Sequence, residues 1–212
     1  MTDTIRKSVL PPQAFTAVAL EIESLPALKP KMIATIKAKD YCVREETLDG
    51  RMLTIRGIRS DDKEMLQEGM HHLSKESIYA RFFTFKSELT DNELKYFTEV
   101  DFVNHVALVA SLDTPAGERP VGVGRYIIPD KVPKENKAEL AFTVDDEYQG
   151  LGIGTILMKH LIVIGRANRI ERFVAYVMPD NRRMRDVLRR AGLPIKYKQD
   201  SAGILEITLT LE

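Results

Sequence analysis

Residues 137–156 read KAELAFTVDDEYQGLGIGTI, and this stretch decides the fold. Its first eight residues are strand-like, and an apolar helix is expected to follow its glycines. Closely spaced glycines between a strand and a helix let backbone N–H groups turn toward an anion at the helix N-terminus. The stretch therefore predicts either a phosphate site at residues 149–155 or a glycine turn that packs the helix tightly against a sheet.

Two familiar phosphate motifs do not fit this turn. A P-loop needs Lys and then Ser or Thr after its last glycine, whereas Gly154 is followed by Thr155 and Ile156. The dinucleotide-binding fingerprint needs its third glycine at position 155, which is a threonine. Any anion at this turn is therefore expected to be held in another way.

The chain on both sides of the turn alternates between strand and helix patterns. Strands are predicted at residues 105–112, 121–128, 172–178 and 204–211, and helices at 155–167 and 181–190. The first two strands are expected to pair as an antiparallel hairpin. A strand-helix-strand unit beside antiparallel hairpins predicts an α/β fold with a mixed sheet and helices on its faces.

The earlier part of the chain is predicted to be richer in helices. A hairpin is expected over residues 41–58, followed by a helix that Ser60 caps and that runs to about Leu73. Ser74 is expected to open a second helical stretch, and the capping box formed by Thr90 and Glu93 predicts a third helix.

Composition excludes several classes of protein. The 212 residues hold 31 Lys and Arg against 31 Asp and Glu, so no global field favours nucleic acid or an anionic membrane as a partner. The single cysteine excludes an internal disulfide, and the four histidines have no metal-ligand spacing, so no metal is expected. No apolar run approaches the ~20 residues of a membrane span, and the start lacks a signal peptide pattern. We therefore predict a cytoplasmic protein, with the oligomeric state left open, a homo-oligomer included.

Residues 1–39 differ in composition and pattern from the rest of the chain. They contain several prolines, an apolar pattern that fits a helix over residues 13–25, and a basic stretch. We predict an N-terminal appendage of unknown role over 1–39 and one domain over 40–212.

The pattern Gln149-x-x-Gly152-x-Gly154, after a strand and before an amphipathic helix, resembles the acetyl-CoA-binding motif of the GNAT superfamily of N-acetyltransferases. The resemblance covers about residues 41–211 and is greatest to the bacterial Pat-like protein lysine acetyltransferases. It includes the stretch LSKESIYARFF at residues 73–83 and the pair Asn181 and Met184. The resemblance implies a GNAT fold, in which a mostly antiparallel twisted sheet contains a splayed parallel strand pair and is flanked by helices.

The resemblance also implies acetyl-CoA as co-substrate, held largely by backbone groups. The pantetheine arm is expected against the strand residues Phe142, Thr143 and Val144. The pyrophosphate is expected at the N–H groups of Gln149, Gly150, Leu151, Gly152, Ile153, Gly154 and Thr155. Asn181 matches the asparagine that helps to hold the pantetheine or adenine side, although a simple N-cap role fits it equally well.

Glu139 matches the general base of Pat-like enzymes, which acts often through water. A lysine amine has an ordinary pKa near 10.4, so a base must remove its proton before attack on a thioester. Burial at the splay is expected to raise the pKa of Glu139 and improve it as a base. The alternative is a solvent-facing strand glutamate without a catalytic role.

The general acid is not identified by the motif. Leu188 stands where many relatives carry a tyrosine that protonates the departing thiolate; water can replace it, and Tyr176 and Tyr197 are weak substitutes. Cys42 as an acyl-carrying nucleophile lacks a partner in the sequence.

The acceptor groove is expected near residues 75–87. Its candidate residues are Arg81, Phe82 and Phe83, although phenylalanines in a helix are more often core. A basic cluster at Arg182, Arg183, Arg185, Arg189 and Arg190 fits either coenzyme A phosphates, an acidic partner or a solvated helix face.

Three functions are left open. The first is acetyl transfer to a protein lysine by direct attack. The second is acetylation of a small amine such as a polyamine, amino acid or aminoglycoside, which an acidic acceptor pocket would favour. The third is a noncatalytic acyl-CoA sensor.

Overall fold

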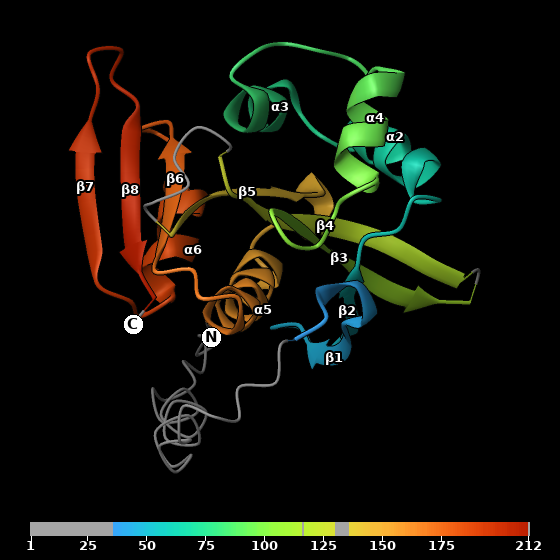
Figure 1. Cartoon of the computed structure of the whole chain (residues 1–212). Coiled ribbons are helices and arrows are strands. Elements are labelled where there is room, and N and C mark those ends of the chain that lie inside the picture. The colour runs from blue at the N-terminus through green and yellow to red at the C-terminus, as the bar shows by residue number, and fades with distance from the viewer. Residues whose placement is uncertain (1–35, 116, 130–135, 212) are drawn as a thin grey trace, which may run out of the picture. The chain divides into compact units, whose positions relative to one another are not determined.

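The computed structural model describes residues 36–115, 117–129 and 136–211 (Figure 1). The elements in chain order are the 3-10 turn η1 (Ala38–Asp40), β1 (Cys42–Glu46), β2 (Met52–Gly57), α2 (Lys63–His71), α3 (Lys75–Phe82), α4 (Asp91–Thr98), β3 (His105–Thr114), β4 (Gly117–Ile127), β5 (Lys137–Val144), the 3-10 turn η2 (Asp146–Tyr148), α5 (Ile153–Ala167), β6 (Arg172–Val177), α6 (Arg182–Arg190), β7 (Ile195–Gln199) and β8 (Leu205–Thr210).

All eight strands form one sheet in the order β1-β2-β3-β4-β5-β6-β8-β7. Every neighbouring pair is antiparallel except β5 and β6, which are parallel and joined through α5. The predicted hairpin of β3 and β4 and the predicted mixed α/β sheet are both confirmed.

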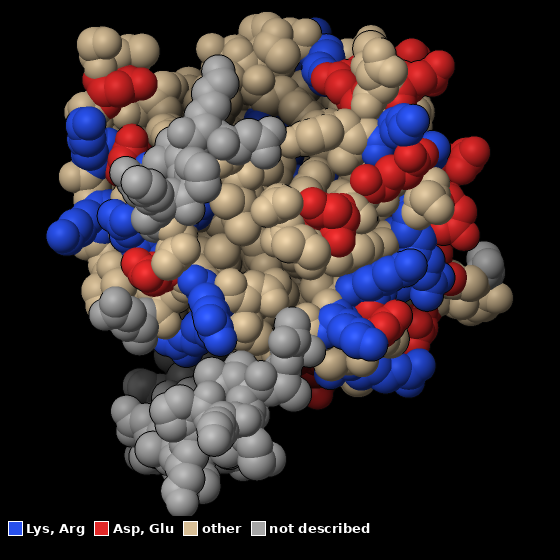
Figure 2. All heavy atoms as spheres, viewed as in Figure 1, with Lys and Arg blue, Asp and Glu red and all other residues tan. Residues whose placement is uncertain are grey.

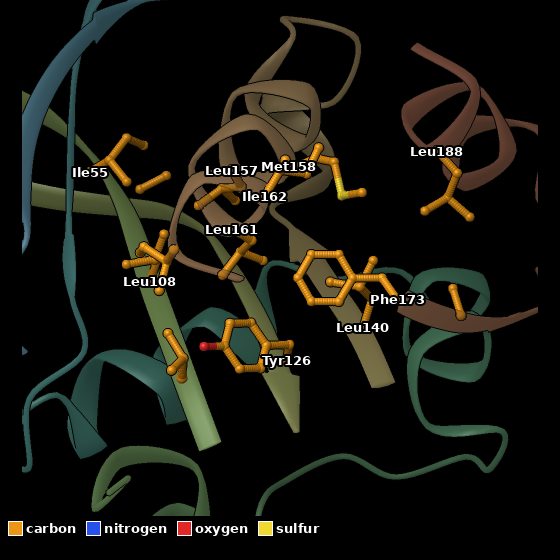
Figure 3. Packing of buried hydrophobic residues seen from close by; sticks show 14 of the residues in the cluster. Ile55, Leu108, Tyr126, Leu140, Leu157, Met158, Leu161, Ile162, Phe173 and Leu188 are labelled. Atoms are coloured by element: carbon orange, nitrogen blue, oxygen red, sulfur yellow. The ribbon is translucent and has the colours of Figure 1, made fainter. Parts of the chain in front are cut away.

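Helices cover both faces of this sheet. Figure 1 shows α5 on one side of the central strands and α2, α3 and α4 on the other. The larger core lies on the α5 side, where the rings of Tyr126 from β4 and Phe173 from β6 have centroids 5.5 Å apart (Figure 3). Smaller clusters around Ile58 and around Met70 and Ile78 fill the opposite side.

Helix α5 anchors the larger core through the apolar stripe that the sequence predicts. Ile153, Leu157, Leu161 and Ile164 are each at most 1% exposed. Burying one such side chain contributes about 1.5–3 kcal/mol to stability. The stripe therefore fixes the helix that follows the glycine turn, and with it the direction of its N-terminus.

One local prediction is wrong, and one strand was not predicted. Ser60 does not cap α2, which begins at Lys63 with Asp62 in the cap position. The carboxylate of Asp62 is used elsewhere, because it accepts hydrogen bonds from Nη1 and Nη2 of Arg56 at 2.8 and 2.9 Å and from the backbone of Arg59 at 2.7 Å. The sequence also gave no sign of β7, whose residues after Ile195 are all exposed and which exists as a strand because it pairs with β8.

The caps of the next two helices are confirmed. The Ser74 side chain accepts a hydrogen bond from the backbone N–H of Ser77, and Thr90 and Glu93 form the complete capping box.

The described part of the chain begins with residues that already pack on the sheet. Ala38 is 1% exposed, and Ile36 lies against the larger core. The helix expected over residues 13–25 lies outside the described residues. Within residues 36–115, 117–129 and 136–211, no helix combines the length and apolar character needed to cross a membrane. On the face shown in Figure 2, basic and acidic side chains are interspersed.

Candidate active site

Strands β5 and β6 separate soon after they begin. They pair only at Lys137 with Arg172, Ala138 with Phe173 and Glu139 with Val174. Beyond Glu139, β5 stays paired with β4 as far as Val144, while its other edge is left open. The predicted splay is therefore confirmed, and it exposes a strand edge to which an extended ligand can add.

A cleft of about 900 Å³ opens at this splay. Residues from α3, β5, the glycine turn, the start of α5, β6 and α6 line it. The predicted site residues that line it are Glu139, Phe142, Thr143, Val144, Gln149, Gly150, Gly152, Ile153, Gly154, Thr155 and Asn181. Leu151 is not among the lining residues: it packs against the larger core, and its carbonyl accepts a hydrogen bond from the backbone of Leu48 at 3.1 Å.

The glycine turn points the N-terminus of α5 into the cleft. Gly150 and Gly152 have φ angles of 84° and 86°, a left-handed conformation that favours glycine. Gly152 is the N-cap of α5, so no side chain caps the first N–H groups of this helix, and its first turn holds no acidic residue. Free N–H groups and the positive end of the helix dipole make this turn suited to an anion.

Gly154 has the packing role that was the other interpretation of the glycines. A Cβ atom built on it lies 3.1 Å from Cγ2 of Val187 in α6, closer than side chains normally approach. The turn thus combines both roles at different positions: Gly150 and Gly152 shape the backbone, and Gly154 lets α5 and α6 approach.

Asp146 ties the glycine turn to the start of α3. Its carboxylate accepts hydrogen bonds from the Ser74 backbone at 2.9 Å, the Ser77 hydroxyl at 2.6 Å and Nε2 of Gln149 at 2.7 Å. Partial burial raises the pKa of Asp146, but the bonds from Ser74 and Ser77 outweigh it and hold the pKa below its ordinary value. Arg183 donates to Oε1 of Gln149 from α6. Sequence reasoning missed Asp146 and Ser77; the only signal was an acidic pair directly before the motif.

Asn181 is the N-cap of α6. Its Oδ1 accepts a hydrogen bond from the backbone of Met184 at 3.0 Å, as the alternative interpretation expected. The residue also lines the cleft, so the capping geometry places its amide at the wall where a ligand lies.

Glu139 lies at the last paired position of the splay, and its side chain is exposed. The expected burial of this carboxylate is therefore wrong, because alternation along β5 buries its neighbours Ala138 and Leu140 on the α5 side instead. Glu139 does line the cleft, and its charge acts on Arg81 of α3.

The other candidates for acid or nucleophile are spread over the domain. Tyr176 lines the cleft, and its partial burial, followed by the charges of Glu206 and Glu139, raises its pKa, which keeps it protonated. Tyr197 lies on the edge strand β7, and Leu188 is buried in the larger core. Cys42 is exposed on β1 and does not line the cleft.

The predicted acceptor groove lies partly in the cleft. Arg81 and Phe83 line it, whereas Phe82 packs against Phe97 on the α4 side. In the basic cluster of α6, Arg182, Arg183 and Arg190 line the cleft. Arg185 instead bonds the carbonyl of Pro179, and Arg189 bonds Asp186.

Comparison with known proteins decides the family. The sequence profile of the acetyltransferase (GNAT) family matches residues 70–193. The chain belongs to this family. As a GNAT acetyltransferase it acts on an amine acceptor, and it is 32% identical over 139 residues to acetyltransferase PA5475 of Pseudomonas aeruginosa, a match that covers 66% of this chain and 73% of that one.

Two further matches confirm the predicted relation of this GNAT chain to Pat-like proteins. Acetyltransferase Pat of Mycolicibacterium smegmatis is 34% identical over 143 residues, which cover 68% of this chain but only 41% of Pat. The crystal structure of the GNAT domain of S. lividans PAT superposes with a TM-score of 0.71 at 32% identity, covering 80% of this chain and 96% of that domain. The fold assignment is thereby confirmed as well.

Proposed function

We propose that this GNAT enzyme transfers the acetyl group of acetyl-CoA to the side-chain amine of a protein lysine, with residues 40–212 as its catalytic domain. One observation carries the proposal: the open edge of β5, the uncapped N-terminus of α5 and the carboxylate of Glu139 line one cleft. One cleft thus combines a binding edge for the thioester arm, a binding turn for the coenzyme A phosphates and a base.

The residues of the cleft fit acetyl-CoA. The open edge at Phe142, Thr143 and Val144 offers backbone groups to the amides of the pantetheine arm. The N–H groups from Gly150 to Thr155 suit the pyrophosphate, because the first turn of α5 has no acidic residue to repel it, whereas the N–H of Gln149 donates to the carbonyl of Asp146. Asn181 keeps its amide nitrogen for the ligand, since its Oδ1 caps α6.

Glu139 acts as the base. Its exposed carboxylate accepts the proton of the amine, directly or through a water molecule, so exposure favours the relay that the family uses. The neutral nitrogen then attacks the carbonyl carbon, the C–S bond breaks, the nitrogen loses its second proton to water, and the thiolate takes a proton from water. Of the two tyrosines that line the cleft, Tyr176 is the exposed one and can supply that proton instead, whereas Tyr148 is buried.

The acceptor class rests on two supports. The relation to Pat-like lysine acetyltransferases favours a lysine side chain. The presence of Arg81 beside Glu139 disfavours cationic polyamines and aminoglycosides, which an acidic pocket would suit.

The test is release of coenzyme A from acetyl-CoA in the presence of protein-lysine, peptide and polyamine acceptors. Wild type is expected to release it in an acceptor-dependent way, and Glu139→Gln is expected to lower kcat by about 10²- to 10⁴-fold, the usual contribution of a general base. Glu68→Gln is the matched control, since Glu68 is exposed outside the cleft.

Full activity of Glu139→Gln at every pH would remove Glu139 as the base and leave the transferase. Binding of acetyl-CoA without turnover of any acceptor would instead favour the noncatalytic sensor.

A further inference from the structure

Arg125 is a buried cation on the acceptor side of the sheet. It is 4% exposed, and its Nη1 donates to the carbonyl oxygen of Phe97 at 3.2 Å. The same Nη1 lies 3.0 Å from Nε2 of His105, and the guanidinium carbon lies 4.6 Å from the centroid of the Phe97 ring. Burial, followed by the charge of Arg125, lowers the pKa of His105 to about 4, so this histidine is neutral and accepts the hydrogen bond.

Arg81 lies close enough to Arg125 for its charge to act on that residue, and its guanidinium packs against two aromatic rings. Its guanidinium carbon is 4.9 Å from the centroid of Phe82 and 5.8 Å from that of Phe97. Among the described residues its side chain makes no hydrogen bond, although the charge of Glu139 acts on it. We call Arg81 and Arg125 the arginine pair.

Arg125 is buried and Arg81 is partly exposed, and neither has the carboxylate partners that another buried arginine of this sheet has. Arg56, which is 6% exposed, is paired with Asp62 at 2.8 Å and Glu118 at 2.9 Å. Although burial lowers the pKa of Arg56, these two carboxylates outweigh it and raise the pKa. Among the described residues no carboxylate forms an ion pair with either member of the arginine pair.

The missing counterion has a physical cost. Burial, followed by the charge of Arg81, lowers the pKa of Arg125 to about 9, which leaves it protonated at neutral pH. A buried cation without a partner is expensive, and a buried anion beside it relieves that cost. The arrangement therefore favours an anion that arrives with a ligand.

A cavity of about 80 Å³ gives that anion a place. Both arginines line it, and the two side-chain hydrogen bonds of Arg125 both use Nη1. Asp145 lines it as well, but its carboxylate lies 3.8 Å from Arg119 and forms no ion pair with either arginine. The cavity reaches the main cleft at Arg81 and Thr143, which line both spaces.

Strand register relates this cavity to Glu139. Arg125 lies directly opposite Ala141 on the neighbouring strand, and Glu139 is two residues from Ala141 on the same sheet face. Such diagonal neighbours have side chains that start roughly 7–8 Å apart. A lysine with its amine at Glu139 and a carboxylate at the arginine pair can span this gap with its flexible stem.

We propose that the arginine pair is a carboxylate subsite that makes this enzyme select lysine acceptors carrying a carboxylate near the reacting amine. This inference rests on the proposed function, because it places the amine at Glu139. The carboxylate belongs either to the lysine itself, as a free amino acid or chain end, or to an acidic neighbour in a peptide.

The test compares acceptors that differ only in the carboxylate. Nα-acetyl-L-lysine and its amide form one pair, and C-terminally amidated peptides with Asp-Lys or Asn-Lys form the second. Wild type is expected to prefer the carboxylate member of one pair by about 10- to 100-fold in kcat/KM, the range of one hydrogen-bonded charge. The pair that shows the preference identifies where the carboxylate lies.

Arg81→Gln is expected to abolish the preference through KM with little change in kcat, and Arg81→Lys to restore part of it. Arg59→Gln, an exposed arginine outside both cavities, is the control and keeps the preference. The acceptor preference of Arg125→Gln is measured as well if its melting curve shows a folded protein. If that variant does not fold, Arg81→Gln alone decides whether the subsite exists.

Three results would overturn the subsite. They are equal rates within both acceptor pairs in wild type, a preference that survives Arg81→Gln, and an Arg81-dependent preference for succinyl-CoA over acetyl-CoA, which would put the carboxylate on the donor. If wild type turns over no acceptor, the proposed function fails separately. Calorimetry with Nα-acetyl-L-lysine and with the Asp-Lys peptide then decides the subsite: binding of either one that Arg81→Gln removes supports it, and binding of neither overturns it.

Discussion

The half of the cleft proposed for acetyl-CoA is made mainly of backbone, whereas the half proposed for the acceptor is made of side chains. The first consists of the open edge of β5, the glycine turn and the start of α5, which are continuous in sequence. The second holds Arg81 on α3 and Glu139 on β5, and Arg81 also lines the smaller cavity that contains Arg125 of β4. The backbone half therefore depends little on side-chain identity, whereas the side-chain half depends on a few charged residues.

The largest expected effect comes from damage to the backbone half. Gly152→Val puts a branched side chain at a φ of 86°, with its Cβ 3.2 Å from Leu48. We expect the turn to shift and acetyl-CoA affinity, measured by calorimetry, to fall about 100-fold or more, since two charge-assisted hydrogen bonds or more are lost.

Gly192→Val separates this effect from backbone strain in general. Gly192 also has a positive φ, 68°, but lies outside the cleft. An equal loss of affinity in Gly192→Val would contradict the role of the turn.

A smaller effect is expected when low pH protonates His105, which packs against Arg125 on the acceptor side. The pKa of His105 falls from its ordinary 6.5 to about 4 in the folded chain, so the unfolded chain binds more protons between these pH values. The stability that neutral His105 contributes is fully present above pH 6.5 and is lost as the pH falls through 4. This loss of unfolding free energy is at most about 3 kcal/mol.

His105→Gln is expected to flatten the loss of unfolding free energy between pH 6.5 and 4, measured by urea denaturation. Exposed His72 provides the control, and His72→Gln should leave the slope unchanged. If His105→Gln leaves the slope unchanged, His105 binds protons equally in the folded and unfolded chain. That result would contradict the account of the cluster around Arg125.

The smallest effect is expected at the link between the halves. Asp146→Asn weakens the hydrogen bonds from Ser74, Ser77 and Gln149, and we expect about 1 kcal/mol less unfolding free energy at pH 7. Because the pKa of Asp146 is held below its ordinary value of 3.8, the difference from wild type should be full above that pH and shrink as the pH falls further.

Asp61→Asn is the control, since Asp61 is exposed and away from the cleft. A difference that stays constant down to the lowest pH would contradict the role of the Asp146 charge.

The sequence predicted the backbone half well, because local signals define it. A strand, spaced glycines and an apolar stripe from Ile153 to Ile164 lie within one continuous segment, and their periodicity needs no knowledge of distant residues. The caps at Ser74 and Thr90 were predictable for the same reason.

The side-chain half was harder, because contacts distant in sequence create it. Arg125 is one charge in the apolar strand VGVGRYI, a pattern that signals an unusual buried residue but names no partner. The expected burial of Glu139 and the expected cap at Ser60 both failed where tertiary pairing decided the outcome. Strand β7 was missed because its pairing with β8, and not its own pattern, makes it a strand.

A crystal structure of the chain with acetyl-CoA tests the central claim most directly. The account predicts the pyrophosphate oxygens within hydrogen-bond distance of the N–H groups of Gly152 and Gly154, the pantetheine arm along Phe142 to Val144, and the thioester facing Glu139. Acetyl-CoA bound away from the splay of β5 and β6, or with its thioester remote from Glu139, would contradict it.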